Sequence, residues 1–203
     1  MSYNVGPVPP INHILVDGAP ANARELNVPS LALDNAQMEA GFIVYDRALA
    51  WLKRSYPQTP ITIVYIPAPS TIYHFSSPDV VADEIYDPTE PQTLGHPHLS
   101  TGRRFLVADA YAKSQKICQR IRMISLGQSV GFVDTRSALR NAAAKQALHG
   151  PRDWNHFNEA GYRLLGNLMA AHLDDSPADV CDDRWPVLAE NVWSLHDLVK
   201  RAE

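Results

Sequence analysis

An aspartate and a histidine three positions apart are the residues of this sequence best suited to acid–base chemistry. Asp153 and His156 are separated only by Trp154 and Asn155. A carboxylate at this spacing in a loop can accept the Nδ1 proton of the imidazole, which fixes the tautomer and leaves Nε2 as a base. The spacing is common by chance, so its position in the chain carries more weight. The pair precedes an amphipathic helix, in a loop at the sheet edge where open α/β proteins build their active sites.

The elements that must position this pair alternate between helix and strand. Apolar residues at helical spacing predict a helix over residues 35–56, and the β-branched run at 61–66 predicts a strand buried on both faces. A second helix, predicted over 103–125, is followed by a second predicted strand at 130–134. Another helix is expected to begin near Asn158, which can cap it. This order favours an α/β domain with a parallel sheet.

The remaining segments are less regular. Prolines break residues 1–34, in which only His13–Val16 is predicted to be a strand, followed by a turn at Asp17-Gly18. Residues 67–102 are rich in proline and acidic side chains, and a connection of this length is expected to be a lid or binding loop. We therefore divide the chain into an irregular segment (1–34), an α/β domain (35–175) and a helical extension (176–203).

Composition excludes several classes of protein. With 45% hydrophobic and 20% charged residues, the 203-residue chain has the balance of a globular domain, and it contains no apolar run long enough to span a membrane. Its net charge of −4 and lack of a Lys/Arg cluster argue against nucleic-acid binding. Cys118 and Cys181 could pair, but with no other cysteine we expect two structural thiols and not a disulfide framework or a zinc site.

The region around the pair resembles the SGNH (GDSL-type) hydrolases and the related acyltransferase-type SGNH domains. The last block of that family is D-x-x-H, commonly followed by N-x-x-G-[YH] and a final helix. Asp153, His156, Asn158, Gly161 and Tyr162 match it in order and spacing. The resemblance covers approximately residues 36–173 and implies a three-layer α/β/α, flavodoxin-like parallel sheet. The chain before residue 61 is too short for all of the family's first strands.

The resemblance also implies a function. His156 would be the general base and acid, Asp153 would orient it, and the substrate would be a carbohydrate or lipid ester. The family's nucleophile is the serine of a G-D-S block, which does not occur in these 203 residues. Ser70, which follows the strand at 61–66, is the candidate nucleophile within the chain, and Asn35 is the candidate oxyanion donor. The remaining candidate substrate contacts are Asn155, Tyr73 and His74.

Other interpretations stay open at this point. The chain could keep the SGNH frame without catalysis and bind a ligand or partner, or loop histidines could bind a metal, the candidates being His74, His96, His98, His149 and His156. No cofactor is expected. A helix predicted over 185–199 would pack on its own domain or form a homodimer contact. The sequence as given indicates a cytoplasmic protein, whereas a start further upstream could add both the G-D-S block and an export signal.

Overall fold

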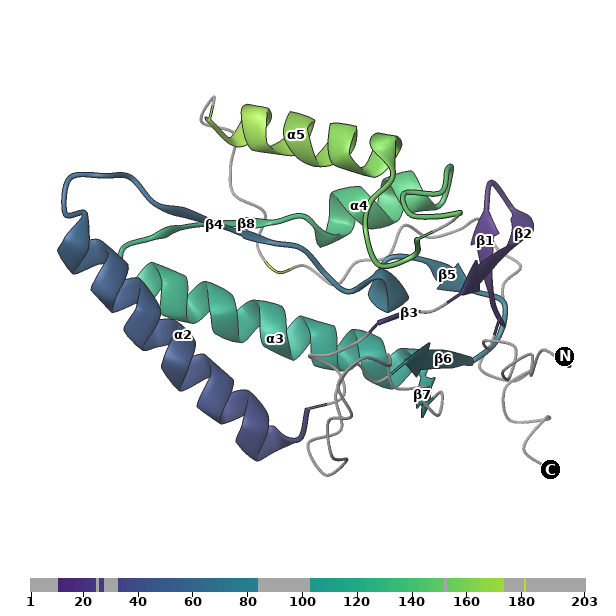
Figure 1. The fold of residues 1–203 in the computed structure, drawn as a ribbon, viewed down its shortest axis with the longest axis horizontal. Coiled ribbons are helices and arrows are strands. Elements are labelled where there is room, and N and C mark those ends of the chain that lie inside the picture. The colour runs from purple at the N-terminus through teal and green to yellow at the C-terminus, as the bar shows by residue number, and fades with distance from the viewer. Residues whose placement is uncertain are drawn as a thin grey trace, which may run out of the picture.

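The computed structural model describes residues 11–24, 26–27, 33–83, 103–151, 153–173 and 181, which form a mixed α/β protein (Figure 1). Helices and strands alternate in its second half, as the sequence predicts. In chain order the elements are β1 (Ile11–Val16), β2 (Ala19–Arg24), β3 (Leu26–Asn27), α2 (Asn35–Ser55), β4 (Thr62–Tyr65), the 3-10 turn η1 (Pro69–Thr71), β5 (His74–Phe75), β6 (Asp79–Asp83), β7 (Arg103–Leu106), α3 (Val107–Gly127), β8 (Gly131–Asp134), α4 (Arg136–Ala143) and α5 (Glu159–Leu173).

The two predicted parallel strands pair with each other. In the register of β4 and β8, Thr62 lies opposite Gly131 and Tyr65 opposite Asp134. In Figure 1 the helices α2 and α3 lie on one side of this pair and α5 on the other. The strand β4 is less buried than expected, because Thr62 is exposed and the following Ile66 is 45% exposed. The parallel α/β arrangement is thus confirmed for two strands.

The N-terminal segment is more regular than expected. The strands β1 and β2 form an antiparallel hairpin, and β5 joins the other edge of β1. Asp17 and Gly18 form the turn with φ angles of 51° and 72°, the left-handed conformation that a two-residue hairpin requires. The expected strand at His13–Val16 and its turn are confirmed. The second strand escaped prediction because it contains Pro20, which an edge strand tolerates.

The proline-rich stretch after β4 also contains strands. Within the expected loop, β5 joins the hairpin and β6 lies between β3 and β7 in a third sheet. Residues 103–106 form the strand β7, so α3 begins at Val107 and not at 103 as predicted. Residues 84–102, the rest of the expected lid, lie outside the described residues. Pairing with distant strands explains why no local periodicity marked this region.

The main hydrophobic core connects the N-terminal strands to the second half of the chain. Ile14 and Leu26 are fully buried in the same cluster as Leu139 of α4 and Leu148 in the loop before α5. The turn of the hairpin is tied to the same region, because Asp17 donates its backbone N–H to the carbonyl of Ala144 at 2.8 Å. The first 34 residues therefore include part of the core that supports the Asp153–His156 loop.

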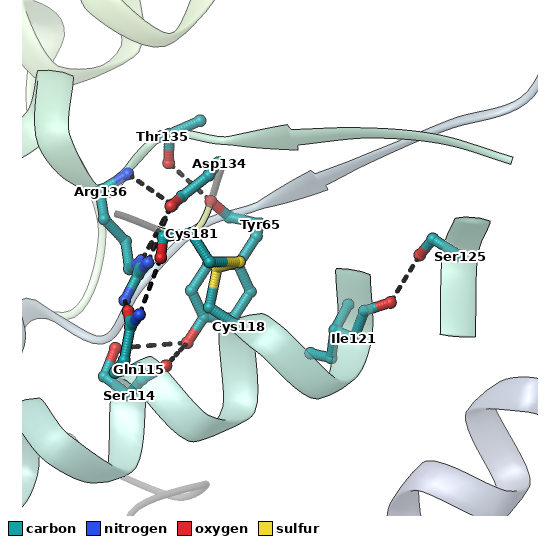
Figure 2. The surroundings of a disulfide bond; sticks show 10 residues. All are labelled: Tyr65, Ser114, Gln115, Cys118, Ile121, Ser125, Asp134, Thr135, Arg136 and Cys181. Carbon is teal, nitrogen blue, oxygen red and sulfur yellow. Dashed lines mark hydrogen bonds and ion pairs between the residues drawn. A yellow bond between two sulfur atoms is a disulfide. The ribbon is translucent and has the colours of Figure 1, made fainter. Parts of the chain in front are cut away.

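One sequence expectation about the cysteines is wrong. Cys118 of α3 and Cys181 form a disulfide (Figure 2), although the sequence favoured two separate thiols. The bond spans 63 positions, so no local pattern could have indicated it.

Residues 182–203, with the predicted tail helix and its homodimer contact, lie outside the described residues. None of the described helices is long and apolar enough to cross a membrane.

Candidate functional site

The structure brings Asp153 and His156 into direct contact. Nδ1 of His156 lies 2.5 Å from Oδ2 of Asp153. Since an ionised carboxylate can only accept hydrogen bonds, Nδ1 is the donor and the neutral ring keeps its lone pair on Nε2. Among the described residues, no hydrogen bond reaches Nε2. The pair therefore has the tautomer and orientation that a general base requires.

The loop itself holds the aspartate in place. Its Oδ1 accepts the backbone N–H groups of Asn155 at 2.8 Å and His156 at 3.2 Å, and its carbonyl accepts the N–H of Gly150 at 2.8 Å. The hydrogen bond from the His156 ring, followed by that from the Asn155 backbone, lowers the pKa of Asp153 below its usual value. The carboxylate is accordingly ionised at neutral pH, as its orienting role requires.

The imidazole faces solvent at the edge of a hollow. The His156 side chain is 71% exposed and that of Asp153 is 52% exposed. The hollow has a volume of about 260 Å³, slightly below the usual range for ligand-binding clefts. It is lined by Gly150, Pro151, Asp153, His156, Phe157 and Asn158.

Two other residues of the D-x-x-H-x-N-x-x-G block fix the start of α5. Asn158 caps this helix, because its Oδ1 accepts the backbone N–H of Gly161 at 3.1 Å. Its Nδ2 also donates to the carbonyls of Ala147 and His149, at 2.9 and 3.2 Å. A Cβ at position 161 would lie 2.5 Å from the carbonyl oxygen of Leu148, so only glycine fits there. Asn158 and Gly161 thus fasten the loop that presents His156.

A buried tyrosine and histidine support the loop from inside. Oη of Tyr73 accepts the backbone N–H groups of Leu148 at 2.8 Å and His149 at 2.9 Å. With both lone pairs used, the phenol donates its proton to Nδ1 of His149, 2.8 Å away. Burial lowers the pKa of His149 to about 4, against an opposing contribution from the Asp153 carboxylate. His149 is therefore neutral at physiological pH.

The other predicted site residues lie in three different environments. Asn155 lies between the paired residues and donates its backbone N–H to Asp153. Tyr73 is fully buried, and His74 is partly buried, which lowers the pKa of His74. Asn35 is the first residue of α2 and borders a separate hollow between α2 and α3. None of these four predicted residues is among those that line the hollow at His156.

Ser70 forms no hydrogen bond with His156. It lies in η1, after β4, at the carboxyl end of the strand as expected from the sequence. Its side chain is fully buried, and its hydroxyl has no hydrogen-bond partner among the described residues. Asp153 and His156 are therefore hydrogen-bonded to each other, whereas the Ser70 hydroxyl is hydrogen-bonded to neither of them.

A metal site built from the loop histidines finds no support in the part of the chain that the structure describes. The one group of three close potential ligands there is Cys118, Asp134 and Cys181, which contains no histidine. His96 and His98 lie outside the described residues.

The sequence interpretation also missed Asp134, whose partner Arg136 is fully buried. The sequence does contain a signal for this pair, because Asp134 ends a buried strand and an arginine follows two positions later.

Comparisons with known proteins give no relative of this chain. No family model matches it, and no curated protein or solved structure was found to match it. The functional interpretation therefore depends on the geometry of its own residues and on the resemblance of the block around His156.

Proposed function

We propose that this chain carries the acid–base pair of an SGNH-type hydrolase or acyltransferase that acts on a carbohydrate or lipid ester. The single observation that carries the proposal is the 2.5 Å contact between Oδ2 of Asp153 and Nδ1 of His156, with the imidazole exposed to solvent. The finer fold that we propose is the three-layer, flavodoxin-like frame of that family, of which β4 and β8 would be two parallel strands.

The exposure of the pair supports a chemical role over a structural one. Asn158 and Gly161 already account for the start of α5 and for the shape of the loop. The His156 ring contributes nothing comparable to packing, since it is 71% exposed and its hydrogen bonds with described residues go only to Asp153. An imidazole held in one tautomer beside a small hollow is suited to moving a proton to and from a bound molecule.

The proposed reaction is acyl transfer from an ester. A hydroxyl group attacks the acyl carbon while Nε2 of His156 takes its proton, and the proton then passes to the oxygen of the leaving alcohol as the ester C–O bond breaks. Asp153 stabilises the imidazolium formed in between. Water or an acceptor alcohol then releases the acyl group by the same steps.

The attacking hydroxyl is the open element of the proposal. Ser70 is the candidate within the chain, and its use would require η1 to move so that the buried hydroxyl reaches Nε2. The same burial favours a second candidate function, in which the hollow binds an acylated ligand without turnover. The two functions make opposite predictions for covalent labelling of the chain.

The test uses a fluorophosphonate probe and short p-nitrophenyl esters on the 203-residue chain. The proposal predicts labelling and turnover in the wild type, with the rate lowered about a thousandfold in His156→Ala. His13→Gln is the matched control, because it removes an exposed imidazole of β1 far along the chain from the loop. Labelling that disappears in Ser70→Ala would identify Ser70 as the nucleophile.

A folded wild-type chain with neither labelling nor turnover would refute the hydrolase function for this chain. The binding function would then be tested by NMR, as a shift of the His156 imidazole signals on addition of an acetylated sugar. Unchanged signals would refute that function as well.

A further inference from the structure

The strand β4 has an open edge. Among the described residues it pairs with β8 alone, and Figure 1 shows this pair between α3 and α5, apart from the other two sheets. The two strands are covered to different extents. Phe132, Val133 and Asp134 of β8 are buried, whereas no residue of β4 is buried. The exposed edge of this small sheet is therefore that of β4.

Backbone groups on this edge have no hydrogen-bond partner among the described residues. The carbonyls of Ile61 and Tyr65 accept backbone N–H groups in and just after β8, at 2.9 and 3.3 Å. The N–H and C=O groups of one peptide unit point in opposite directions, and successive units of a strand alternate. The N–H groups of Thr62, Val64 and Ile66 therefore point away from β8, and no hydrogen bond joins them to another described residue.

The sequence of this edge lacks the features that keep edge strands apart. Natural edge strands commonly carry charged side chains or a proline, which discourage pairing with another chain. Between Arg54 and Asp79 the sequence contains no Asp, Glu, Lys or Arg, and residues 61–66 contain no proline. This continuous run of β-branched and aromatic side chains is typical of a strand with neighbours on both sides. In the single chain, however, Ile66 is 45% exposed.

We propose that β4 pairs with β4 of a second copy of this chain, antiparallel and about a twofold axis at Val64. Val64 then exchanges both backbone hydrogen bonds with Val64 of the second copy. On either side of the axis, Thr62 lies opposite Ile66 of the second copy, so the outward N–H groups gain acceptors. The neighbouring register, centred on Ile63, is poorer because it sets Ile66 opposite Pro60, which has no N–H to donate.

The lack of charge favours a second copy as the occupant of this edge. At a twofold axis each strand meets its own sequence, so a strand of one charge would repel itself. Residues 61–66 carry no charge and therefore pair with themselves without repulsion. The pairing closes at two copies, because it uses the edge of β4 in both of them. In the resulting sheet, with the order β8-β4-β4-β8, each β4 has a neighbour on both sides.

The experiment measures the assembly of the full chain and of two double variants by analytical ultracentrifugation. Both variants change Thr62 and Ile66, which are exposed and lie on the face of the strand opposite Tyr65, whose hydroxyl contacts α3. Thr62→Lys with Ile66→Lys sets like charges opposite each other across the axis, whereas Thr62→Lys with Ile66→Glu sets opposite charges there. We expect a monomer–dimer equilibrium in the wild type. The dissociation constant of the dimer should be about tenfold higher in the first variant than in the second.

Either of two results would overturn the proposal. One is a folded wild-type chain that stays monomeric up to millimolar concentration, which would leave a strand of another protein as the occupant of the edge. The other is a dimer with the same dissociation constant in both double variants, each shown to be folded by circular dichroism, because such a dimer is formed by another surface. Both results concern only β4, so neither affects the function proposed for Asp153 and His156.

Discussion

Two aspartates of this protein, Asp134 and Asp153, each pair with a side chain two or three positions further along the chain, in opposite surroundings. Asp134 and Arg136 are 2% and 0% exposed, whereas Asp153 and His156 are 52% and 71% exposed. Both aspartates also accept the backbone N–H of the residue two positions further along the chain. The same local arrangement thus occurs in two different environments. A buried pair must stay together because each charge has no water to replace its partner, while an exposed pair adds little stability and is available for chemistry.

Removing one member of the buried pair should have the largest effect on stability. In Asp134→Asn the guanidinium of Arg136 loses its counter-charge while it remains buried, so we expect the free energy of unfolding to fall by about 3–5 kcal/mol. Denaturant titration measures this. The matched variant Asp153→Asn breaks the exposed pair and should cost less than about 1 kcal/mol. Equal losses in the two variants would contradict the distinction between the pairs.

The buried histidine should make the stability of the protein depend on pH. The pKa of His149 is about 4 in the folded chain and near 6.5 in the unfolded chain. Below pH 6.5 the unfolded chain therefore takes up a proton that the folded chain refuses. We expect stability to fall by about 3 kcal/mol as the pH drops from about 6.5 to 4, and to be recovered above that range.

Unfolding titrations at several pH values test this expectation. His149→Gln cannot take up the proton and should flatten the pH dependence between about 4 and 6.5. A steep slope that persists in His149→Gln would assign the pH dependence to other groups.

Two glycines of α5 provide a smaller test of how the exposed pair is held. In Gly161→Ala the new Cβ would lie 2.5 Å from the carbonyl oxygen of Leu148, so we expect a loss of about 1–3 kcal/mol and displaced His156 signals in NMR spectra. Gly166 has nothing within 4 Å of a Cβ. Gly166→Ala should therefore stabilise the chain by about 0.5–1 kcal/mol through helix propensity. The hypothesis fails if both substitutions stabilise the protein.

We expect the smallest effect on stability from a substitution of His156, the residue at the centre of the proposed chemistry. His156→Ala removes an exposed ring and should change the free energy of unfolding by less than about 0.5 kcal/mol. Thermal or denaturant unfolding measures this beside the ester assay. A large loss of stability would mean that the imidazole is a structural element of the loop. Its exposure would then no longer favour a catalytic role.

Features that depend on nearby residues were predictable from the sequence. The helix from Asn35, the parallel strands at 62–65 and 131–134 and the Asn158 cap follow from periodicity, β-branched runs and capping chemistry. The contact between Asp153 and His156 likewise follows from their spacing within one loop. Such patterns are readable because the interacting groups are close in the chain.

Features that depend on distant partners required the tertiary structure. The Tyr73–His149 hydrogen bond joins positions 76 apart, and the disulfide joins positions 63 apart. The strand β2, with Pro20, is formed by pairing with β1 against its own local signals. Burial also decided which aspartate stabilises the fold and which one is exposed beside a hollow, because the water around a charge depends on what packs over it. Short-range spacing thus specifies the two pairs, whereas packing decides how far each pair is exposed to water.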